Sequence, residues 1–325
     1  MSAGLAPFRC LPLYLEKPWG SGVRLRGVVG LPAPPRTGEA WLVSDVDGSP
    51  TPILDGPWAG RTLRELVAAE PVAVLGPEAA GAGEGARFPL LVKLLEVAGR
   101  LSVQVHPDGP TARALGQGQR GKCEAWFVLD AGPAGEVGLG FEEPVAPAAL
   151  PELARAGTLG ERLRRHRPGA GEAIEILPGT FHYARDLLFL EVQETCDLTY
   201  RVWDWGSDRA LHLAEAAECL RRIPARAPGP PATLTGQGQL EVAPRSPFRF
   251  TVHGLVEGAR LEVPGPPGPR VVVALSPGLS VWAGGAGLEL SSGQAAVLPA
   301  CCDRAEVRSA GDPAQVAVAG VAPGA

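Results

Sequence analysis

Short runs of β-strand character, separated by turns rich in glycine and proline, recur along most of the chain. The 325 residues include 43 glycines and 34 prolines, which do not follow the fixed repeat of a collagen. Strand-like runs lie, for example, at Val23–Gly27, Glu39–Ser44 and Leu187–Thr195, and similar runs continue after Gly238. Many short strands at this spacing predict an all-β sandwich or barrel.

Helical patterns are few, and a proline-rich connector at Ala225–Leu234 is the best candidate boundary between two units. Apolar residues recur at helical spacing in Arg61–Ala69 and Ala210–Arg222, and in short pieces of Pro147–Arg165. The predicted organisation is an N-terminal β domain over residues 1–234, with a helical insert at about 140–170 and 208–223, and a C-terminal β domain over residues 235–325.

Charge and cysteine usage narrow the class of protein. A net charge of −5 argues against a general nucleic-acid binder, although a local basic cluster could still hold an anionic small molecule. No apolar run is long enough for a membrane span, and the first residues lack the features of a signal peptide. The six cysteines show no CxxC spacing, which favours reduced thiols in a cytoplasmic protein.

The segment Leu101–Asp108 (LSVQVHPD) combines an apolar and a polar strand face. Ser102, Gln104 and His106 alternate with apolar residues and therefore share one face, and Pro107 ends the strand. A carboxamide and an imidazole on one face, backed by apolar residues on the other, suit the inside of a barrel that contains a polar site.

Two further segments complete a possible metal site. In Gly121–Leu129, alternation places Lys122 and Glu124 on one face, and in Leu177–Ala184 a Pro-Gly turn leads His182 into a strand. The predicted ligands of one metal ion are Gln104, His106, Glu124 and His182. This set of nitrogen and oxygen donors suits Zn²⁺ at roughly 2.0–2.2 Å and would also accept Mn²⁺, Co²⁺ or Fe²⁺.

A single histidine or a Gln-x-His pair is weak evidence for a metal site. We expect His166, His212 and His253 to be ordinary core or surface residues. The prediction depends on three strand-borne segments taken together, each with polar residues on one face.

The same segments resemble a known family. FPLLVKLLEVAGRLSVQVHPD, GKCEAWFVL, LPGTFHYA and FLEVQETCDLTYRVWDW are similar to motifs of the type I mannose-6-phosphate isomerases, and the resemblance runs from Glu16 to about Arg209. It implies a mainly β, cupin-type sandwich or jelly-roll barrel with a small helical insert and a second, cupin-like β domain at the C-terminus.

The resemblance also implies an activity and a set of site residues. It implies one Zn²⁺ per chain at Gln104, His106, Glu124 and His182, with Mn²⁺ or Co²⁺ as possible substitutes. The implied reaction interconverts mannose 6-phosphate and fructose 6-phosphate, so the partner is a small sugar phosphate. Further functional residues implied by the resemblance are Lys93, Ser102, Lys122, Glu191 and Arg201.

Such a reaction moves a proton between neighbouring carbons through an enediolate, which needs a base and stabilisation of negative charge at oxygen. We expect Glu191 to act in proton transfer and Arg201 to orient or stabilise the substrate anion. Lys93 and Ser102 are expected to bind phosphate, with Lys122 near the metal and the substrate oxygens. Which group is the base stays open, because Glu191 could instead form a structural ion pair with Arg201.

Three alternative functions stay open from the sequence. The first is an isomerase that acts on another sugar or sugar phosphate. The second is a mononuclear metal cupin oxygenase that uses His106, His182 and Glu124, although Gln104 and the nearby basic residues argue against it. The third is a sugar-binding regulatory cupin. The chain could be a monomer or a small homo-oligomer, and no membrane or nucleic-acid partner is expected.

Overall fold

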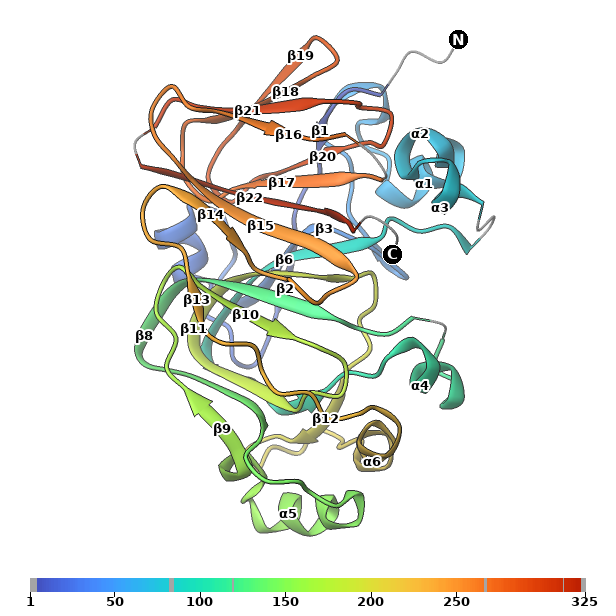
Figure 1. Ribbon diagram of the computed structural model, residues 1–325, viewed down its shortest axis with the longest axis vertical. Coiled ribbons are helices and arrows are strands. Elements are labelled where there is room, and N and C mark those ends of the chain that lie inside the picture. The colour runs from blue at the N-terminus through green and yellow to red at the C-terminus, as the bar shows by residue number, and fades with distance from the viewer. Residues whose placement is uncertain (1–4, 82–84, 119, 266–267, 312, 323–325) are drawn as a thin grey trace.

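The computed structural model describes residues 5–81, 85–118, 120–265, 268–311 and 313–322. Strands dominate this part of the chain and the helices are short, so the expected mainly β class is confirmed. The C-terminal sheets lie at one end of the long axis, and helices α5 (Leu150–Ala156) and α6 (Leu213–Arg222) lie at the other (Figure 1).

Ten antiparallel strands form the largest sheet. Its main path runs β13-β10-β8-β11-β6-β3-β2, and β7, β9 and β12 pair beside it. The strands are β2 (Leu13–Glu16), β3 (Thr37–Val43), β6 (Leu90–Arg100), β7 (Val103–Val105), β8 (Glu124–Phe141), β9 (Leu163–His166), β10 (Glu172–Ile176), β11 (His182–Glu194), β12 (Tyr200–Trp203) and β13 (Ala232–Thr233).

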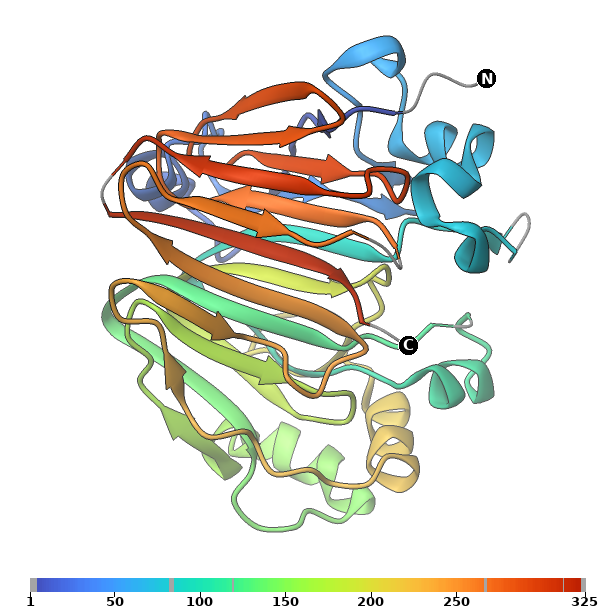
Figure 2. The ribbon, with the colours of Figure 1, turned by 45° about the horizontal axis from the view of Figure 1, so that its top comes forward.

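A six-stranded and a four-stranded sheet enclose a separate core in the C-terminal part of the chain. In Figure 2 the orange and red strands of these two sheets lie above the green strands of the large sheet. The strands of the six-stranded sheet are β1 (Phe8–Arg9), β14 (Gly238–Glu241), β15 (Phe248–Leu255), β17 (Arg270–Ala274), β20 (Ala295–Leu298) and β22 (Ala314–Val321). The four-stranded sheet contains β16 (Arg260–Val263), β18 (Leu279–Ala283), β19 (Ala286–Leu290) and β21 (Ala305–Ser309).

The chain passes from the large sheet to the six-stranded sheet between β13 and β14, but strand β1 pairs with β20 and belongs to the C-terminal sheet. Buried residues of both sheets also pack into one apolar core. The domain boundary between residues 234 and 235 stays a prediction.

The remaining elements are short and lie outside the large sheets. They are β4 (Asp45–Val46), β5 (Ser49–Pro50), η1 (Leu25–Val29), η2 (Gly56–Trp58), α1 (Leu63–Ala69), α2 (Pro71–Leu75), α3 (Pro77–Ala80), α4 (Gly109–Ala114), η4 (Pro147–Ala149) and η5 (Leu159–Arg162). Helix α1 begins with a capping box formed by Thr62 and Glu65. None of the helices in the described residues combines the length and the apolar character needed to cross a bilayer.

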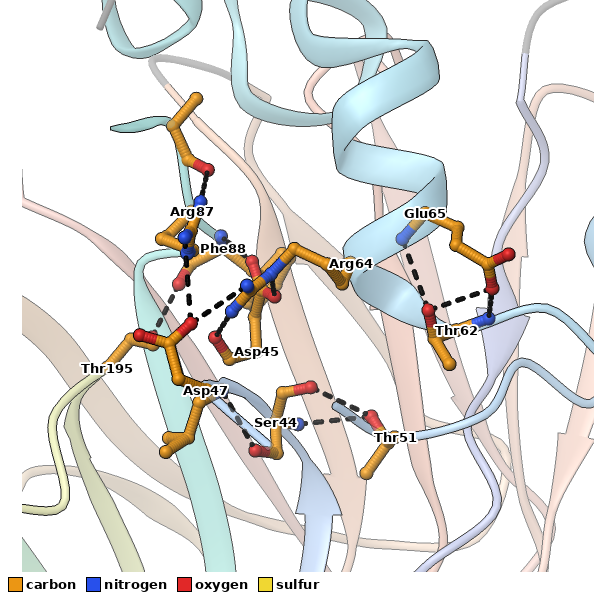
Figure 3. A network of polar contacts seen from close by, with 12 residues as sticks. Ser44, Asp45, Asp47, Thr51, Thr62, Arg64, Glu65, Arg87, Phe88 and Thr195 are labelled. Carbon is orange, nitrogen blue, oxygen red and sulfur yellow. Dashed lines mark hydrogen bonds and ion pairs between the residues drawn. The ribbon is translucent and has the colours of Figure 1, made fainter. Parts of the chain in front are cut away.

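Buried Asp45 joins helix α1 to the start of β6 (Figure 3). Its carboxylate pairs with Arg64 of α1 and accepts a hydrogen bond from the Phe88 amide at 2.7 Å. The Phe88 carbonyl in turn accepts a hydrogen bond from Thr195, which follows β11. This network fixes the same end of the two central strands, β6 and β11.

The expectation of a strand at Val23–Gly27 is wrong, because this segment enters the helical turn η1. The cause is Glu96, a fully buried residue of β6. Its carboxylate accepts hydrogen bonds from the amides of Val23, Arg24 and Leu25 at 3.1–3.2 Å. A carboxylate that binds the free amides of a first turn stabilises helical backbone there.

Strand β6 divides its side chains between two cores. Val92 and Leu94 pack in the core shared with the C-terminal strands, whereas Leu95 and Val97 pack in the core on the opposite face of the sheet. Because successive side chains of a strand point to opposite faces, Lys93 shares the second face with Leu95 and Val97. We call this second face the inner face of the large sheet.

Candidate metal centre and its surroundings

Three predicted metal ligands meet in the large sheet. His182 begins β11 and pairs with Gln104 of β7, His106 follows β7, and Glu124 begins β8. One ligand atom from each of His106, Glu124 and His182 lies within 4.8 Å of the others, and all three residues are buried. Gln104 reaches the same place, since its Nε2 lies 3.1 Å from Nε2 of His182.

Backbone carbonyls orient both imidazoles. Nδ1 of His106 lies 3.0 Å from the Leu198 carbonyl oxygen, and Nδ1 of His182 lies 2.9 Å from that of Thr180. A carbonyl only accepts hydrogen bonds, so each Nδ1 carries the proton and each Nε2 presents a lone pair in the neutral ring. The Nε2 atoms lie 3.4 Å and 3.2 Å from the two oxygens of Glu124.

This arrangement fits a divalent cation. The pKa of His106 is lowered to about 3, mainly by burial and then by the positive charge of Lys122. Burial opposes ionisation of Glu124, but the ammonium of Lys122 and the close contacts with His106 and His182 prevail and hold the pKa of Glu124 well below its usual value. Neutral imidazole and ionised carboxylate are the forms that bind metals. Neither oxygen of Glu124 has a well-formed hydrogen bond within the described residues, which leaves lone pairs for a metal.

Lys122 lies against this ligand cluster. Its Nζ is 2.7 Å from Glu124 Oε2 and 3.2 Å from His106 Nε2, and the residue is almost fully buried. Lys122 precedes β8, and its contact with Glu124 brings a cation directly beside the candidate ligands, on the side where the sequence predicted it.

A row of four side chains crosses the inner face beside the ligands. Trp41, Lys93, Glu191 and Trp126 are aligned across β3, β6, β11 and β8. Lys93 Nζ lies 2.6 Å from Glu191 Oε1, and Trp126 Nε1 donates to Glu191 Oε2 at 2.8 Å. The ring of Trp126 also contacts His182 edge-on at 5.7 Å between centroids, so it joins this row to the ligand cluster.

Both members of the Lys93–Glu191 pair have shifted pKa values. The pKa of Glu191 is raised, mainly by burial and then by the negative charge of Glu124, although Lys93 acts in the opposite direction. Burial alone would lower the pKa of Lys93, but Glu191 and Glu39 raise it above its usual value. Glu39 is itself paired with Lys17 at 3.0 Å.

Ser102 and Arg201 lie at the border of the ligand cluster. Ser102 is buried directly before β7, and Arg201 of β12 pairs with Gln104. The Arg201 amide donates to Nδ1 of His212 at 3.0 Å, and its Nη1 donates to the Ala210 carbonyl at 2.8 Å. The polar contacts of Arg201 are therefore with Ala210 and His212, which precede α6, and not with Glu191.

Two further buried polar residues of this region, Glu39 and Gln193, were given no role from the sequence. Glu39 accepts a hydrogen bond from Trp41 Nε1 at 2.6 Å, but its burial depends on the pairing of β2, β3 and β6 and leaves no local signal. Gln193 does have a signal, because alternation along β11 places it on the same face as Glu191.

Comparison with known proteins decides the family. Residues 8–122 match the family model described as phosphomannose isomerase type I, catalytic domain. The mannose-6-phosphate isomerase of Streptococcus mutans is 34% identical over 256 residues, which cover 74% of this chain and 78% of that protein. The chain belongs to the type I mannose-6-phosphate isomerase family.

The fold of this isomerase family extends over nearly the whole chain. A mannose 6-phosphate isomerase from Bacillus subtilis has a crystal structure that is 26% identical, with a TM-score of 0.82 over 98% of this chain and all of that one. A zinc-bound mannose 6-phosphate isomerase, 16% identical, shows the same fold with a TM-score of 0.77 over 98% of this chain and 100% of that one. The expected cupin-type architecture is therefore confirmed, including the C-terminal strands, where the sequence resemblance was only general.

Proposed function

We propose that this chain interconverts mannose 6-phosphate and fructose 6-phosphate by moving a proton between C1 and C2 of the sugar. The observation that carries the proposal is the buried Lys93–Glu191 pair beside the His106–Glu124–His182 cluster. Together they offer what an enediolate reaction requires, a carboxylate for proton transfer and a place for a Lewis acid.

The metal we propose is Zn²⁺, one per chain, held by Gln104, His106, Glu124 and His182. Two imidazoles with oxygen donors and no thiolate support this choice, and Mn²⁺ or Co²⁺ would suit the same donors. When bound, the metal supplies stabilisation of the negative charge that develops on the substrate oxygens. Gln104 would ligate through its carboxamide oxygen. A rotation of the amide group by half a turn puts this oxygen where Nε2 now lies, on the side of His182.

The residues of the inner face then have separate tasks. Glu191 takes the proton from one carbon and returns it to the next, and its raised pKa brings it closer to a working pH near neutrality. Trp126 and Lys93 hold one carboxylate oxygen each and so fix its direction. Lys122, beside Glu124, donates to the substrate oxygens.

The anionic end of the substrate is assigned to Ser102, Lys93 and Arg201. Arg201 supports this assignment because its Nε is buried and has no hydrogen-bond partner within the described residues. Lys93 is paired with Glu191, so a phosphate at Lys93 would share the ammonium with that carboxylate.

A coupled assay that detects fructose 6-phosphate tests the proposal. Purified protein loaded with Zn²⁺ should turn over mannose 6-phosphate, lose activity after a chelator, and recover when Zn²⁺, Mn²⁺ or Co²⁺ is added back. Turnover of a different phosphorylated aldose, with none of mannose 6-phosphate, would move the proposal to that sugar. Absence of isomerase activity in the metal-loaded protein with every sugar phosphate tried would refute it.

A further inference from the structure

Gln193 is a buried residue of the inner face to which the reaction above gives no task. It lies near the end of β11, two residues from Glu191, and its main chain pairs with Glu124 of β8. Residues i and i+2 of a strand, and directly paired residues of neighbouring antiparallel strands, point to the same face. The side chain of Gln193 therefore shares a face with Glu191 and Glu124, and the residue is fully buried.

The carboxamide of Gln193 has a defined orientation. Its Nε2 donates to the carbonyl oxygen of Glu194 at 3.1 Å and to that of Cys196. Both partners are pure acceptors, so the nitrogen end of the carboxamide must face them. The oxygen end, Oε1, is directed away from these two carbonyls.

Oε1 of Gln193 has no hydrogen-bond donor among the described residues. A buried acceptor without a donor is costly, and such atoms are uncommon away from functional sites. The carboxylate oxygens of Glu124 and Oε1 of Glu191 also lack a well-formed hydrogen bond, although Lys122 Nζ lies 2.7 Å from Oε2 of Glu124 and Lys93 Nζ lies 2.6 Å from Oε1 of Glu191. Several acceptor atoms without a well-formed hydrogen bond therefore lie on this part of the inner face.

The geometry points to Gln193 as a residue that positions the sugar, because its Oε1 accepts a hydrogen bond from one hydroxyl group of the bound substrate. The inference rests on the proposed isomerase function and adds a determinant of specificity to it. A sugar phosphate carries several hydroxyl donors, and one of them would satisfy the unpaired Oε1 of Gln193. A site built around such a hydrogen bond rejects an analogue without the hydroxyl, since the buried oxygen then stays unpaired.

The nitrogen end of Gln193 has a separate, structural task that the experiment must distinguish. It holds the turn after β11, and this turn leads to Leu198, whose carbonyl orients His106 at 3.0 Å. Gln193→Met keeps the length of the side chain and removes both polar ends. Gln193→Glu keeps acceptor oxygens but loses the two donated hydrogen bonds.

The test measures kcat/KM for mannose 6-phosphate and for its 3-deoxy and 4-deoxy analogues. The hydroxyl at C2 is tested separately, through the inhibition constant of 2-deoxyglucose 6-phosphate. In the wild-type protein, removal of one particular hydroxyl should lower kcat/KM or affinity by roughly 10- to 100-fold. Gln193→Met should show a similar loss with mannose 6-phosphate and no further loss with that analogue. Gln193→Glu should keep most of the discrimination.

Gln239→Leu is the matched control, because Gln239 is exposed on β14, outside the large sheet, and should behave as wild type. If Gln193→Met lowers the values for mannose 6-phosphate and for every analogue by the same factor, Oε1 contacts none of the hydroxyls at C2, C3 and C4, and the inference fails. Turnover of mannose 6-phosphate by the wild type reports separately on the proposed function. Should that turnover be absent, calorimetric binding of the same ligands to the metal-loaded proteins gives the same comparison for Gln193.

Discussion

The ammonium of Lys93 lies 2.6 Å from Oε1 of Glu191, and both residues are at least 97% buried, with relative exposures of 3% and 2%. Trp126 Nε1 donates a hydrogen bond to the second oxygen of the same carboxylate at 2.8 Å. The proposed proton-transfer group is therefore held between the ammonium of Lys93 and the indole of Trp126, and removal of Lys93 or Glu191 would leave the other buried without its ion-pair partner.

Lys93→Met should destabilise the protein by about 3–5 kcal/mol, because removal of one member of a buried ion pair leaves the other uncompensated. Urea unfolding measures this loss. The double variant Lys93→Met/Glu191→Gln, which removes both charges, should recover a large part of the stability. Equal unfolding free energies for Lys93→Met and the wild type would show that the pair contributes nothing to stability.

Glu191→Gln should lower kcat by about 10²- to 10⁴-fold, the usual contribution of a general acid or base, while the protein keeps its metal. Steady-state kinetics and metal analysis on the same sample separate the two effects. Glu257→Gln is the control, since Glu257 is exposed in the C-terminal part. Near-normal turnover of a folded, metal-loaded Glu191→Gln protein would eliminate Glu191 as the base.

The stability contributed by Glu39 should disappear in acid. Burial opposes its charge, but Lys93 and Lys17, with a hydrogen bond from Trp41, keep the pKa of Glu39 below its usual value. A lowered folded-state pKa means that the stabilisation is complete above the unfolded pKa of about 4.3 and is lost as the pH falls through the folded value. Below about pH 4.3, unfolding free energies should fall more steeply for the wild type than for Glu39→Gln. Parallel curves would argue against this coupling.

Glu96→Gln should destabilise the protein by about 1–3 kcal/mol, because an amide in place of the carboxylate leaves part of the η1 backbone without an acceptor. Glu96 is fully buried and accepts from three successive amides. Hydrogen exchange should show faster exchange at Val23, Arg24 and Leu25, with little change in β11. Unchanged exchange at these three amides would contradict the proposed role of Glu96.

The positions of the candidate ligands were largely predictable because their signals are local. Strand alternation placed Gln104 with His106 and Lys122 with Glu124, and the turn before His182 marked the start of a strand. His106, Glu124 and His182 meet as these patterns require. Strand faces are encoded by neighbouring residues, so a short segment is sufficient to assign them.

The partners of these residues were less predictable because they depend on strand register. The pairing of Lys93 with Glu191, rather than Glu191 with Arg201, follows from the alignment of β6 with β11. The helical turn η1 depends on Glu96, which is more than 70 residues away in the chain. The local sequence of Val23–Gly27 favours a strand, but hydrogen bonds from its amides to the distant Glu96 stabilise a helical turn instead.

Strand β1 has a consequence for the order in which the chain is built. Phe8 and Arg9 pair with Val297 and Ala296, so β1 is synthesised long before the strand that it pairs with, β20. Until β20 has emerged, the backbone groups of β1 that face it lack their ladder partners, and Phe8 lacks part of its apolar cover. We expect nascent chains that stop before Ala295 to leave this edge available to chaperones.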